Sequence, residues 1–332
     1  MHNRIQIPDT DLAVYPIGLG TASAGLGWNH ADADRVFETY LECGGNLIDT
    51  AHVYSDWVAG EKARSERVIG DWLERSGKRN EIVLMTKGGH PDVSPDAGPW
   101  KSRMSHADMR TDLEGSLRQL RTEYIDLYFY HRDDRMQSVE EEIETMEQFV
   151  KEGKIRYYAC SNWDADRMYR AQEYCREKGY RGFAADQSLM NLAMKYMNEP
   201  GDPTLRCIRG DIFRFHEEHP EVMAMPFSGN CGGFFHSILT KGESAVSGSH
   251  YNTENNRKAA ENLKKLVEKY HCSITQAVMG FFRNQPFACV PLYATSKPEH
   301  IVDVCKTVEI PFTVEDYEEV LRCTEQNRKD TE

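Results

Sequence analysis

Short apolar runs alternate along the chain with longer segments in which apolar residues recur at helical spacing. Runs rich in β-branched and aromatic residues are typical of buried strands. We predict strands at VYPIGLG near Ile17, NLIDT, EIVLMTK, IDLYFYH, IRYYACS, FAADQ, VMAMPF and ACVPLY. Amphipathic patterns predict helices at Asp32–Cys43, Lys62–Arg75, Ala107–Arg121, Val139–Lys151 and Asp164–Lys178. In the third helix Met109, Leu113, Leu117 and Leu120 repeat with helical period, and Ser105 stands at the expected N-cap.

This alternation of strands and helices predicts parallel strands joined by right-handed crossovers. About eight such units in a chain of 332 residues favour a (β/α)8 barrel, a TIM barrel with an eight-stranded parallel sheet. A doubly wound sheet is the alternative, but GLGTASAGLG does not fit its G-x-G-x-x-G fingerprint in register. Because no segment resembles a linker, we expect one domain over residues 1–332. Residues 312–332 are expected to form an acidic helix and a polar tail, which either pack under the barrel or close over its pocket.

The composition of the chain limits the cell locations and binding partners that we expect for the protein. The formal net charge of −13 disfavours nucleic acid and anionic membrane surfaces as partners. No apolar run approaches the roughly 18–20 residues of a membrane helix, and MHNRIQIPDT lacks the apolar core of a signal peptide. Nine cysteines at irregular spacing, without Cys-x-x-Cys, indicate reduced thiols rather than disulfides or a zinc site. We therefore expect a cytoplasmic protein without a metal, and the sequence is silent on its oligomeric state.

Three consecutive predicted strands end in ionisable residues, Asp49, Lys87 and His131, and Tyr54 follows the first of them closely. Taken singly, each is more typical of a turn, a cap or a loop charge. In a barrel, however, the carboxyl ends of neighbouring strands converge, and enzymes of this fold carry their chemistry there.

These four residue types suit proton transfer to a carbonyl oxygen. A lysine paired with an aspartate and close to a phenol stabilises the phenolate, so we expect the pKa of Tyr54 to fall from about 10 toward working pH. Such a tyrosine is a competent general acid, and a histidine beside it can donate a hydrogen bond to the same oxygen. No evident nucleophile or metal-ligand motif competes with this interpretation. Hydride must then arrive from elsewhere.

The segments IGLGT, NLIDTAHVYS, IVLMTKGG, LRTEYIDLYFYH, VKEGKIRYYACSNW and SKPEH resemble, in this order, landmarks of the aldo-keto reductase family, over residues of about 15–306. The resemblance implies a (β/α)8 barrel that binds a nicotinamide dinucleotide without a Rossmann domain. It also implies an NAD(P)H-dependent oxidoreductase that interconverts a carbonyl and an alcohol. By the same resemblance Tyr54 is the general acid/base, Lys87 and Asp49 tune it, and His131 orients the carbonyl.

The resemblance also implies a set of cofactor-binding residues. Ser161, Asn162 and Gln187 should hold the nicotinamide carboxamide, and Thr21 should contact the cofactor. Without the resemblance, Ser161 and Asn162 are explained equally well as a helix N-cap. Phe227 replaces the usual stacking tyrosine. Backbone N–H groups of a loop including Ser228, Gly229 and Gly233 should cradle the pyrophosphate. The adenosine end is expected at Thr295, Ser296, Lys297, His300 and Asp303.

The adenosine segment departs from the family pattern. Ala294 stands where a basic residue is usual, His300 where an arginine is usual, and Val304 where an asparagine is usual. Lys297 is thus the one sure positive charge for a 2′-phosphate. We favour NADP(H), the common choice in the family, and keep NAD(H) as an alternative.

The loops after the strands suggest a substrate class. The expected substrate contacts are His52, Trp57, His90, Trp100 and Arg103, with Asn191 and Lys195 as further loop candidates. Aromatic faces and hydrogen-bonding side chains together suit a small-molecule sugar, polyol or related metabolite. Two alternatives remain. One is a nucleotide-binding regulatory subunit with vestigial catalysis, and the other is an aldolase that forms a Schiff base on Lys87, which pairing with Asp49 disfavours.

Overall fold

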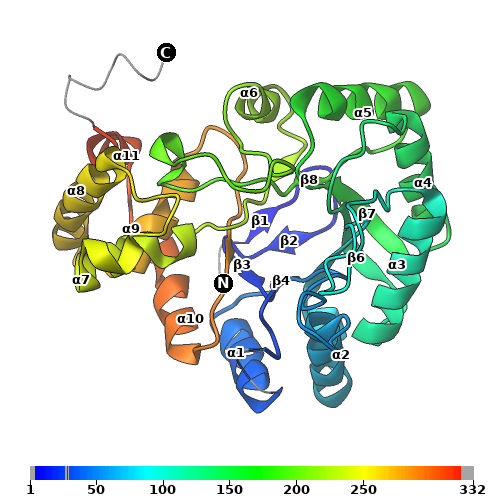
Figure 1. Cartoon of the computed structure of the whole chain (residues 1–332), viewed down its shortest axis with the longest axis horizontal. Coiled ribbons are helices and arrows are strands. Elements are labelled where there is room, and N and C mark those ends of the chain that lie inside the picture. Colours follow the sequence, from blue (N-terminus) through cyan, green and yellow to red (C-terminus); the bar gives the residue numbers. More distant parts are fainter. Residues whose placement is uncertain (1–3, 27, 29, 323–332) are drawn as a thin grey trace.

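The eight predicted strands form one parallel sheet that closes into a barrel. The computed structural model describes residues 4–26, 28 and 30–322. The strands are β3 (Gly18–Gly20), β4 (Leu47–Asp49), β5 (Val83–Gly88), β6 (Ile125–Tyr130), β7 (Ile155–Cys160), β8 (Ala185–Asp186), β9 (Met223–Ala224) and β10 (Leu292–Tyr293). Neighbours in space follow chain order from β3 to β9, and β10 lies beside β3 (Figure 1). A parallel bridge between Ala224 and Cys289 joins β9 to the segment that enters β10 and closes the ring. The fold is a (β/α)8 barrel, and the doubly wound alternative is excluded because its strand order reverses.

A short antiparallel hairpin, β1 (Ile5–Gln6) and β2 (Ala13–Val14), precedes the barrel and fills its amino-terminal end. Its residues Ile7, Leu12 and Val14 join the same buried cluster as the barrel interior. The sequence analysis missed this hairpin, because strands of two residues are too short to show an alternating pattern. With this end filled by apolar side chains, the carboxyl end is left for a site.

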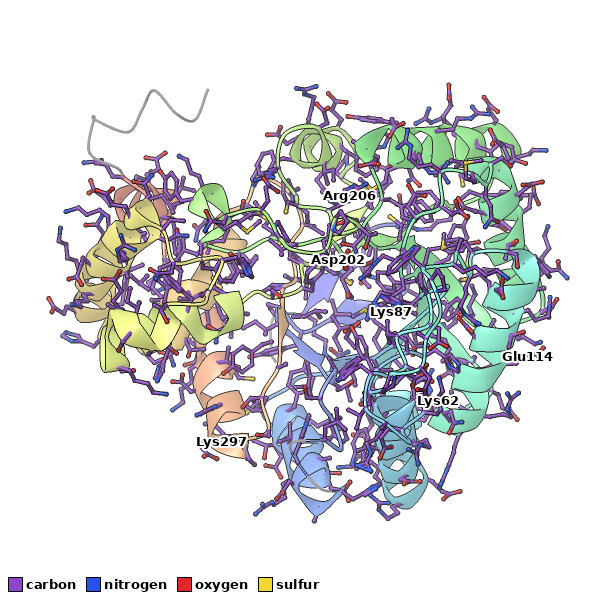
Figure 2. All side chains as sticks on the ribbon, viewed as in Figure 1. Lys62, Lys87, Glu114, Asp202, Arg206 and Lys297 are labelled. Carbon is purple, nitrogen blue, oxygen red and sulfur yellow. The ribbon has the colours of Figure 1, made fainter. Side chains whose placement is uncertain are left out.

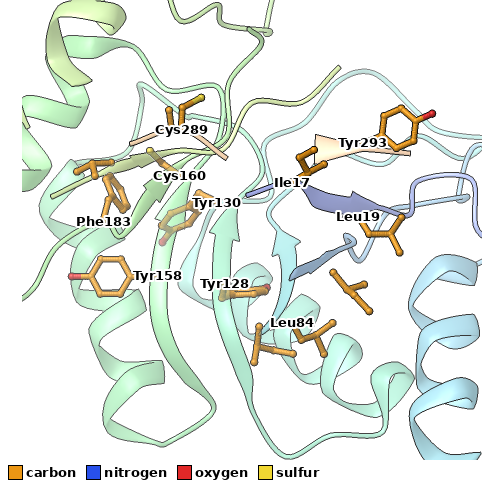
Figure 3. Close-up of a cluster of buried hydrophobic side chains, with 14 of the residues drawn as sticks. Ile17, Leu19, Leu84, Tyr128, Tyr130, Tyr158, Cys160, Phe183, Cys289 and Tyr293 are labelled. Carbon is orange, nitrogen blue, oxygen red and sulfur yellow. The ribbon is translucent and has the colours of Figure 1, made fainter. Parts of the chain in front are cut away.

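The pleat of the strands determines which polar residues meet at that end. Inward-facing side chains form the interior cluster, among them Leu47, Met85 and Phe129. The outward-facing residues pack against the helices, as Figure 3 shows for Leu84, Tyr128, Tyr130 and Tyr158. Because side chains alternate along a strand, the residues two positions beyond the interior ones also point inward. Those residues are Asp49, Lys87 and His131.

The five predicted helices are confirmed to within about two residues at each end. The helices that surround the barrel are α1 (His30–Glu42), α2 (Arg64–Ser76), α3 (His106–Leu120), α4 (Val139–Lys151), α5 (Ala165–Lys178), α6 (Asp211–Glu218) and α10 (Pro298–Cys305). Ser105 is confirmed as an N-cap, since its side chain accepts a hydrogen bond from the backbone N–H of Asp108. Short 3-10 helices lie at η1 (Arg79–Glu81), η2 (Met194–Tyr196), η3 (Cys231–Gly233), η4 (Glu243–Val246), η5 (Gly280–Asn284) and η6 (Lys306–Glu309).

Between β9 and β10 the chain builds a helical lobe on one side of the barrel (Figure 1). The lobe consists of α7 (Phe234–Lys241), α8 (Glu254–Tyr270), α9 (Ile274–Met279) and the later helix α11 (Val314–Val320). It has its own apolar core, which includes Phe234, Phe235, Leu263, Leu266, Tyr317 and Val320.

Helix α11 settles the placement of the C-terminal helix. Tyr317 donates a hydrogen bond to the carbonyl of Ala277, so α11 packs on the lobe, against α9. Neither expected placement, under the barrel or over the pocket, is correct for this helix, because its apolar side chains complete the core of the lobe. The expected polar tail, residues 323–332, lies outside the described residues. No helix within residues 4–26, 28 and 30–322 is long and apolar enough to cross a membrane.

Candidate active site

Lys87 lies at the centre of the barrel mouth and joins the two residues predicted to work with it (Figure 2). Its Nζ donates to Asp49 Oδ1 at 2.6 Å, to the carbonyl of Thr50 at 2.7 Å and to Tyr54 Oη at 3.3 Å. The side chain is buried, with 1% of its surface exposed. An ammonium group has three N–H donors, so these contacts use all of them. Lys87 therefore holds the Tyr54 hydroxyl by a hydrogen bond whose donor is charged.

The protonation states follow from burial and the ion pair. Burial opposes the charge on Lys87, but the contacts with Asp49 and Tyr54 outweigh it and hold the lysine pKa above its usual value. For Tyr54 the effect of burial is larger than the effect of the neighbouring charge. Burial raises its pKa, and the opposing effect of Lys87 does not overcome this, so the pKa lies above the usual value near 10. The expected fall of this pKa toward working pH is thus wrong for the protein without ligands, and Tyr54 is a protonated phenol.

His131 stands beside Tyr54 and is uncharged at neutral pH. The two ring centroids are 5.7 Å apart. Burial, together with the neighbouring His90, Arg132 and Lys87, holds the pKa of His131 well below its usual value. A neutral imidazole has one N–H to donate, which suits a hydrogen bond to a carbonyl oxygen.

Gln187 supports the ion pair from β8. Its Nε2 donates to Asp49 Oδ1 at 2.9 Å, so one carboxylate oxygen accepts from both Lys87 and Gln187. The residue is buried and does not line the large cavity described below. Its amide N–H therefore positions Asp49, a contact that sequence reasoning did not foresee because it joins residues 138 positions apart.

A cavity of about 1070 Å³ opens from Tyr54 and His131 and runs between the barrel mouth and the helical lobe. This volume exceeds the roughly 300–1,000 Å³ of a typical small-molecule pocket, so it accommodates a long ligand and a second small one. The predicted cofactor residues that line it are Thr21, Ser161, Asn162, Phe227, Ser228, Gly229, Gly233, Thr295, His300 and Asp303. Gln187, Ser296 and Lys297 do not line it.

Ser161 and Asn162 are not the N-cap of the following helix. Helix α5 begins at Ala165, and Asp164 occupies the N-cap position. Asn162 has a left-handed backbone, with φ of 61°, and its amide donates to Ser161 Oγ at 2.9 Å. This unusual backbone turns the pair toward the cavity.

The loop before α7 has the backbone of an anion cradle. Positive φ values occur at Ser228, Cys231, Gly232 and Gly233. Such left-handed residues aim backbone N–H groups into one concavity, and the N-terminus of a helix adds a partial positive charge. The Cβ positions of Gly232 and Gly233 meet nothing within 4 Å among the described residues, so the cradle is open to a ligand. Its chemistry fits a pyrophosphate.

The adenosine end contains a cation, hydroxyl groups and a carboxylate that already accepts hydrogen bonds from neighbouring side chains. The Asp303 carboxylate accepts from Ser273 Oγ at 2.7 Å and from Gln276 Nε2 at 3.0 Å, and so joins α10 to α9. Thr295 Oγ1 lies 3.2 Å from His300 Nδ1. Lys297 is exposed at the start of α10, at the edge of the molecule in Figure 2.

None of the five predicted substrate residues is among the residues that line the cavity, but three of them lie close to Tyr54 and His131. The His90 ring centroid lies 4.7 Å from that of His131, and Trp100 lies 5.9 Å from His90. Trp57 packs edge-on against Tyr54, with centroids 6.4 Å apart. Burial and the charge of Arg132 lower the pKa of His90 to about 4, so this rim is neutral and aromatic.

The other two predicted substrate residues point away from the cavity. His52 lies between α2 and α3, where Nδ1 is 3.3 Å from Glu66 Oε2 and the ring covers Gly115. The guanidinium of Arg103 forms an ion pair with Asp112 on α3. Both are held by carboxylates outside the barrel, which loop position alone does not reveal.

Several cavity residues were missed by sequence reasoning. They are Arg132, Leu205, His236, Ser237, Val267, Cys272, Ser273, Ile274 and Thr275, among others. Arg132 was detectable, since it follows the predicted His131 directly. The residues from the helical lobe were not, because their patterns are those of ordinary amphipathic helices. Among the residues described, no cluster of three or more histidine, cysteine or acidic side chains could hold a metal ion.

A (β/α)8 barrel with a lysine-bonded tyrosine beside a large cavity, at the carboxyl ends of its strands, has the arrangement of a barrel enzyme. The model of the Aldo/keto reductase family matches residues 16–325. The chain belongs to this family, and it is an NAD(P)-dependent oxidoreductase that acts on carbonyl and alcohol groups.

Curated relatives that match nearly the whole chain include an aryl-alcohol dehydrogenase and a norsolorinic acid reductase. The chain is 26% identical to "Aryl-alcohol dehydrogenase [NADP(+)]" of Phanerodontia chrysosporium over 333 residues, which cover 93% of this chain and 82% of the relative. It is 26% identical to "Norsolorinic acid reductase A" of Aspergillus parasiticus over 331 residues, covering 96% of this chain and 80% of the relative. A shorter match, 34% identical over 186 residues, joins 55% of this chain to 56% of "Uncharacterized oxidoreductase YrpG" of Bacillus subtilis.

Because burial outweighs Lys87, Tyr54 should remain a neutral phenol in the free protein. In a spectrophotometric titration at about 295 nm, where phenolate absorbs, the wild type and Tyr54→Phe should give the same curve from about pH 6 to 10. A phenolate that titrates near neutral pH in the wild type and is lost in Tyr54→Phe would contradict this.

Proposed function

We propose that the protein reduces the carbonyl group of an aromatic aldehyde or ketone to the alcohol, or runs the reverse reaction, with Tyr54 as general acid/base. The observation that carries this proposal is the Lys87 ammonium, which bonds Asp49 Oδ1, the Thr50 carbonyl and Tyr54 Oη together. A phenol held by a buried cation is stabilised as its proton leaves. That is the property required of an acid that protonates an oxygen as negative charge develops.

Each residue of the site has a defined part in the reaction. The nicotinamide cofactor, when bound, supplies or accepts the hydride. Tyr54 donates its proton to the carbonyl oxygen during reduction and takes it back during oxidation. Lys87 stabilises the phenolate that remains, and Asp49 keeps Lys87 charged and in place. The neutral His131 donates a hydrogen bond to the carbonyl oxygen and orients it.

Ser161 and Asn162 are proposed to hold the nicotinamide carboxamide, with the Phe227 ring against the nicotinamide face. All three line the cavity near His131. The loop from Ser228 to Gly233 is proposed to bind the pyrophosphate through backbone N–H groups other than those of Cys231 and Gly233, which donate to the carbonyls of Ser228 and Asn230. Thr21, at the end of β3, is tied to Asp49 through its hydroxyl, which donates to the Asp49 carbonyl at 2.7 Å.

NADP(H) is the proposed cofactor. A site for NAD(H) usually presents an acidic side chain to the ribose hydroxyls. Here the Asp303 carboxylate is held by Ser273 and Gln276. The 2′-phosphate is proposed to bind to the side chains of Thr295, Ser296, Lys297 and His300. The name of the relative from Phanerodontia chrysosporium, which includes NADP(+), supports the same choice.

An aromatic substrate fits the rim better than a sugar or polyol. Trp57 lies edge-on beside Tyr54, His90 lies beside His131, and Trp100 lies beside His90, so aromatic rings stand next to the acid, just outside the cavity lining. Two of the hydrogen-bonding groups that favoured a sugar, His52 and Arg103, lie away from the cavity. The names of the relatives, aryl-alcohol dehydrogenase and norsolorinic acid reductase, point the same way.

The two other functions have less support. A regulatory subunit with vestigial catalysis would not need the complete set of Asp49, Tyr54, Lys87 and His131. An aldolase would need Lys87 as a neutral amine, whereas its pKa is raised by Asp49 and Tyr54 against the effect of burial.

Replacing Tyr54 by phenylalanine should lower kcat for reduction of a benzaldehyde by about 10²–10⁴-fold, because the proton donor is lost. The dissociation constant for NADPH, followed by tryptophan fluorescence, should change little. Tyr157→Phe is the matched control, since that hydroxyl donates to Asp11 on the surface. Full activity in Tyr54→Phe would overturn the assignment, and NADPH binding without any turnover in the wild type would favour the regulatory subunit.

A panel of NADPH-dependent reductions tests the substrate class. Substituted benzaldehydes and aryl ketones should give kcat/KM values at least about tenfold above those of aldoses, ketoses and inositol derivatives. A tenfold ratio corresponds to a difference of about 1.4 kcal/mol in transition-state binding between the two substrate classes. A preference for sugars of similar size would restore the polyol hypothesis and reject the aromatic one.

Lys297→Ala should raise the KM for NADPH about tenfold and leave the KM for NADH nearly unchanged, because one charge-assisted contact with the 2′-phosphate is lost. Lys306→Ala is the matched control, since that exposed lysine stands at the opposite end of α10 from Lys297. A wild type that prefers NADH, or a Lys297→Ala variant that weakens both cofactors equally, would contradict the proposed 2′-phosphate site.

A further inference from the structure

Arg132 is a buried cation in the catalytic end of the cavity to which the proposed reaction assigns no part. It follows His131 directly and lines the cavity together with Tyr54 and His131. Only 11% of its side-chain surface is exposed. Its charge reaches the reacting groups, because it helps to lower the pKa values of both His90 and His131, where burial is the main cause.

The guanidinium is held in position but is not saturated. Nε donates to Thr204 Oγ1 at 3.0 Å, Nη1 to the carbonyl of His131 at 2.8 Å, and Nη2 to Asp202 Oδ2 at 3.3 Å. A guanidinium has five N–H donors. Among the contacts of the described residues three are used, and one N–H on each terminal nitrogen remains.

The counterion of Arg132 stands outside the site. Asp202 lies on the loop that crosses beside the barrel mouth in Figure 2, and 39% of its side-chain surface is exposed. It lines a neighbouring cavity rather than the catalytic one. Its other carboxylate oxygen accepts from the Thr204 hydroxyl at 2.6 Å and from the Thr204 backbone at 2.9 Å. Asp202 therefore balances Arg132 from the solvent side and leaves the cavity side of the guanidinium uncompensated.

The other charges at this end cancel or are absent. Lys87 and Asp49 form an ion pair of 2.6 Å. His131 and His90 are neutral near pH 7, since the pKa of each is lowered, that of His90 to about 4. Apart from the Lys87–Asp49 pair, the catalytic end thus has one cation, Arg132, whose counterion Asp202 lies on its solvent side.

We propose that Arg132 is a specificity-determining residue that binds a carboxylate on the substrate, so that the preferred substrates are carbonyl compounds that also carry a carboxylate group. Two N–H groups on the terminal nitrogens of a guanidinium match the two oxygens of a carboxylate. The inference rests on the proposed function, and it adds to that function an anionic group beside the aromatic carbonyl. Because Arg132 is partly shielded from water in the cavity wall, its attraction to an anionic group on a ligand is stronger than it would be at an exposed surface.

Arg132 also has a structural role, because its contacts join the loop after β6 to residues 202–204. Loss of that role would slow the reduction of every substrate. Loss of a carboxylate contact would slow the reduction of anionic substrates alone. The ratio of two matched substrates therefore separates the two roles.

The test compares 4-formylbenzoate with its methyl ester, which has nearly the same shape but no charge. The wild type should reduce the acid with kcat/KM at least about tenfold above the ester, mainly through a lower KM. Arg132→Met should lower this acid-to-ester ratio at least about tenfold, and Arg132→Lys should keep part of it, because the charge remains without the fork of donors. Asp202→Asn should raise the ratio, since the competing anion is neutralised.

Arg209→Met is the matched control for loss of an arginine close by, on the loop that carries Asp202. Its guanidinium pairs with Glu199 at 2.7 Å and lines the neighbouring cavity. The acid-to-ester ratio should be unchanged in this variant. Benzoate, but not benzamide, should inhibit reduction of the ester competitively in the wild type, and this inhibition should weaken in Arg132→Lys.

A wild type that reduces the ester as well as the acid would overturn the inference, and so would an Arg132→Met variant that slows both substrates equally. The wild-type ratio and the benzoate inhibition stay decisive if Arg132→Met does not fold. Reduction of the ester without preference for the acid would reject the carboxylate site and leave the proposed function intact. Binding of NADPH without reduction of either compound would reject the proposed function.

Discussion

The ion pair between Lys87 and Asp49 is the interaction on which the catalytic end of the molecule depends. Both side chains are buried, and separating either one from its partner would leave an unpaired charge in the barrel, which typically costs about 3–5 kcal/mol. The structure surrounds the pair with hydrogen bonds. Gln187 donates to Asp49, and the carbonyl of Thr50 accepts from Lys87. The third N–H of Lys87 donates to the Tyr54 hydroxyl. The ion pair therefore also stabilises negative charge on the phenol oxygen.

The position of that pair follows from the barrel. Parallel strands bring residues from β4, β5 and β8 to one end, while the N-terminal hairpin fills the other end with apolar side chains. The helical lobe then builds a second wall, with its own apolar core, next to the barrel mouth. The cavity of about 1070 Å³ lies between these two separately packed bodies of side chains.

The charges around Tyr54 show how burial and Coulomb attraction compete. Sequence reasoning correctly placed a lysine beside the phenol and expected its pKa to fall. It could not weigh the desolvation of the phenol. Desolvation is the larger effect, so the pKa of Tyr54 is raised rather than lowered. Burial also disfavours the charged forms of His131 and His90. Because the charged form of a histidine is the protonated one, burial lowers their pKa values. Among these neutral rings, Arg132 keeps its charge because a guanidinium is too basic to lose its proton.

Alternation along strands and helical periodicity were sufficient to predict the barrel, five of its helices, and the inward direction of Asp49, Lys87 and His131. These properties are local, since each depends on residues a few positions apart. Packing between distant segments decided the rest. His52 is turned outward by Glu66, Arg103 is held by Asp112, and Asp303 is bound by residues of α9. The helical lobe and the Gln187 contact with Asp49 likewise join parts of the chain that no local pattern relates. A side chain's direction in a loop depends on the partner that satisfies its charge or hydrogen bond, and that partner is chosen only when the chain has folded.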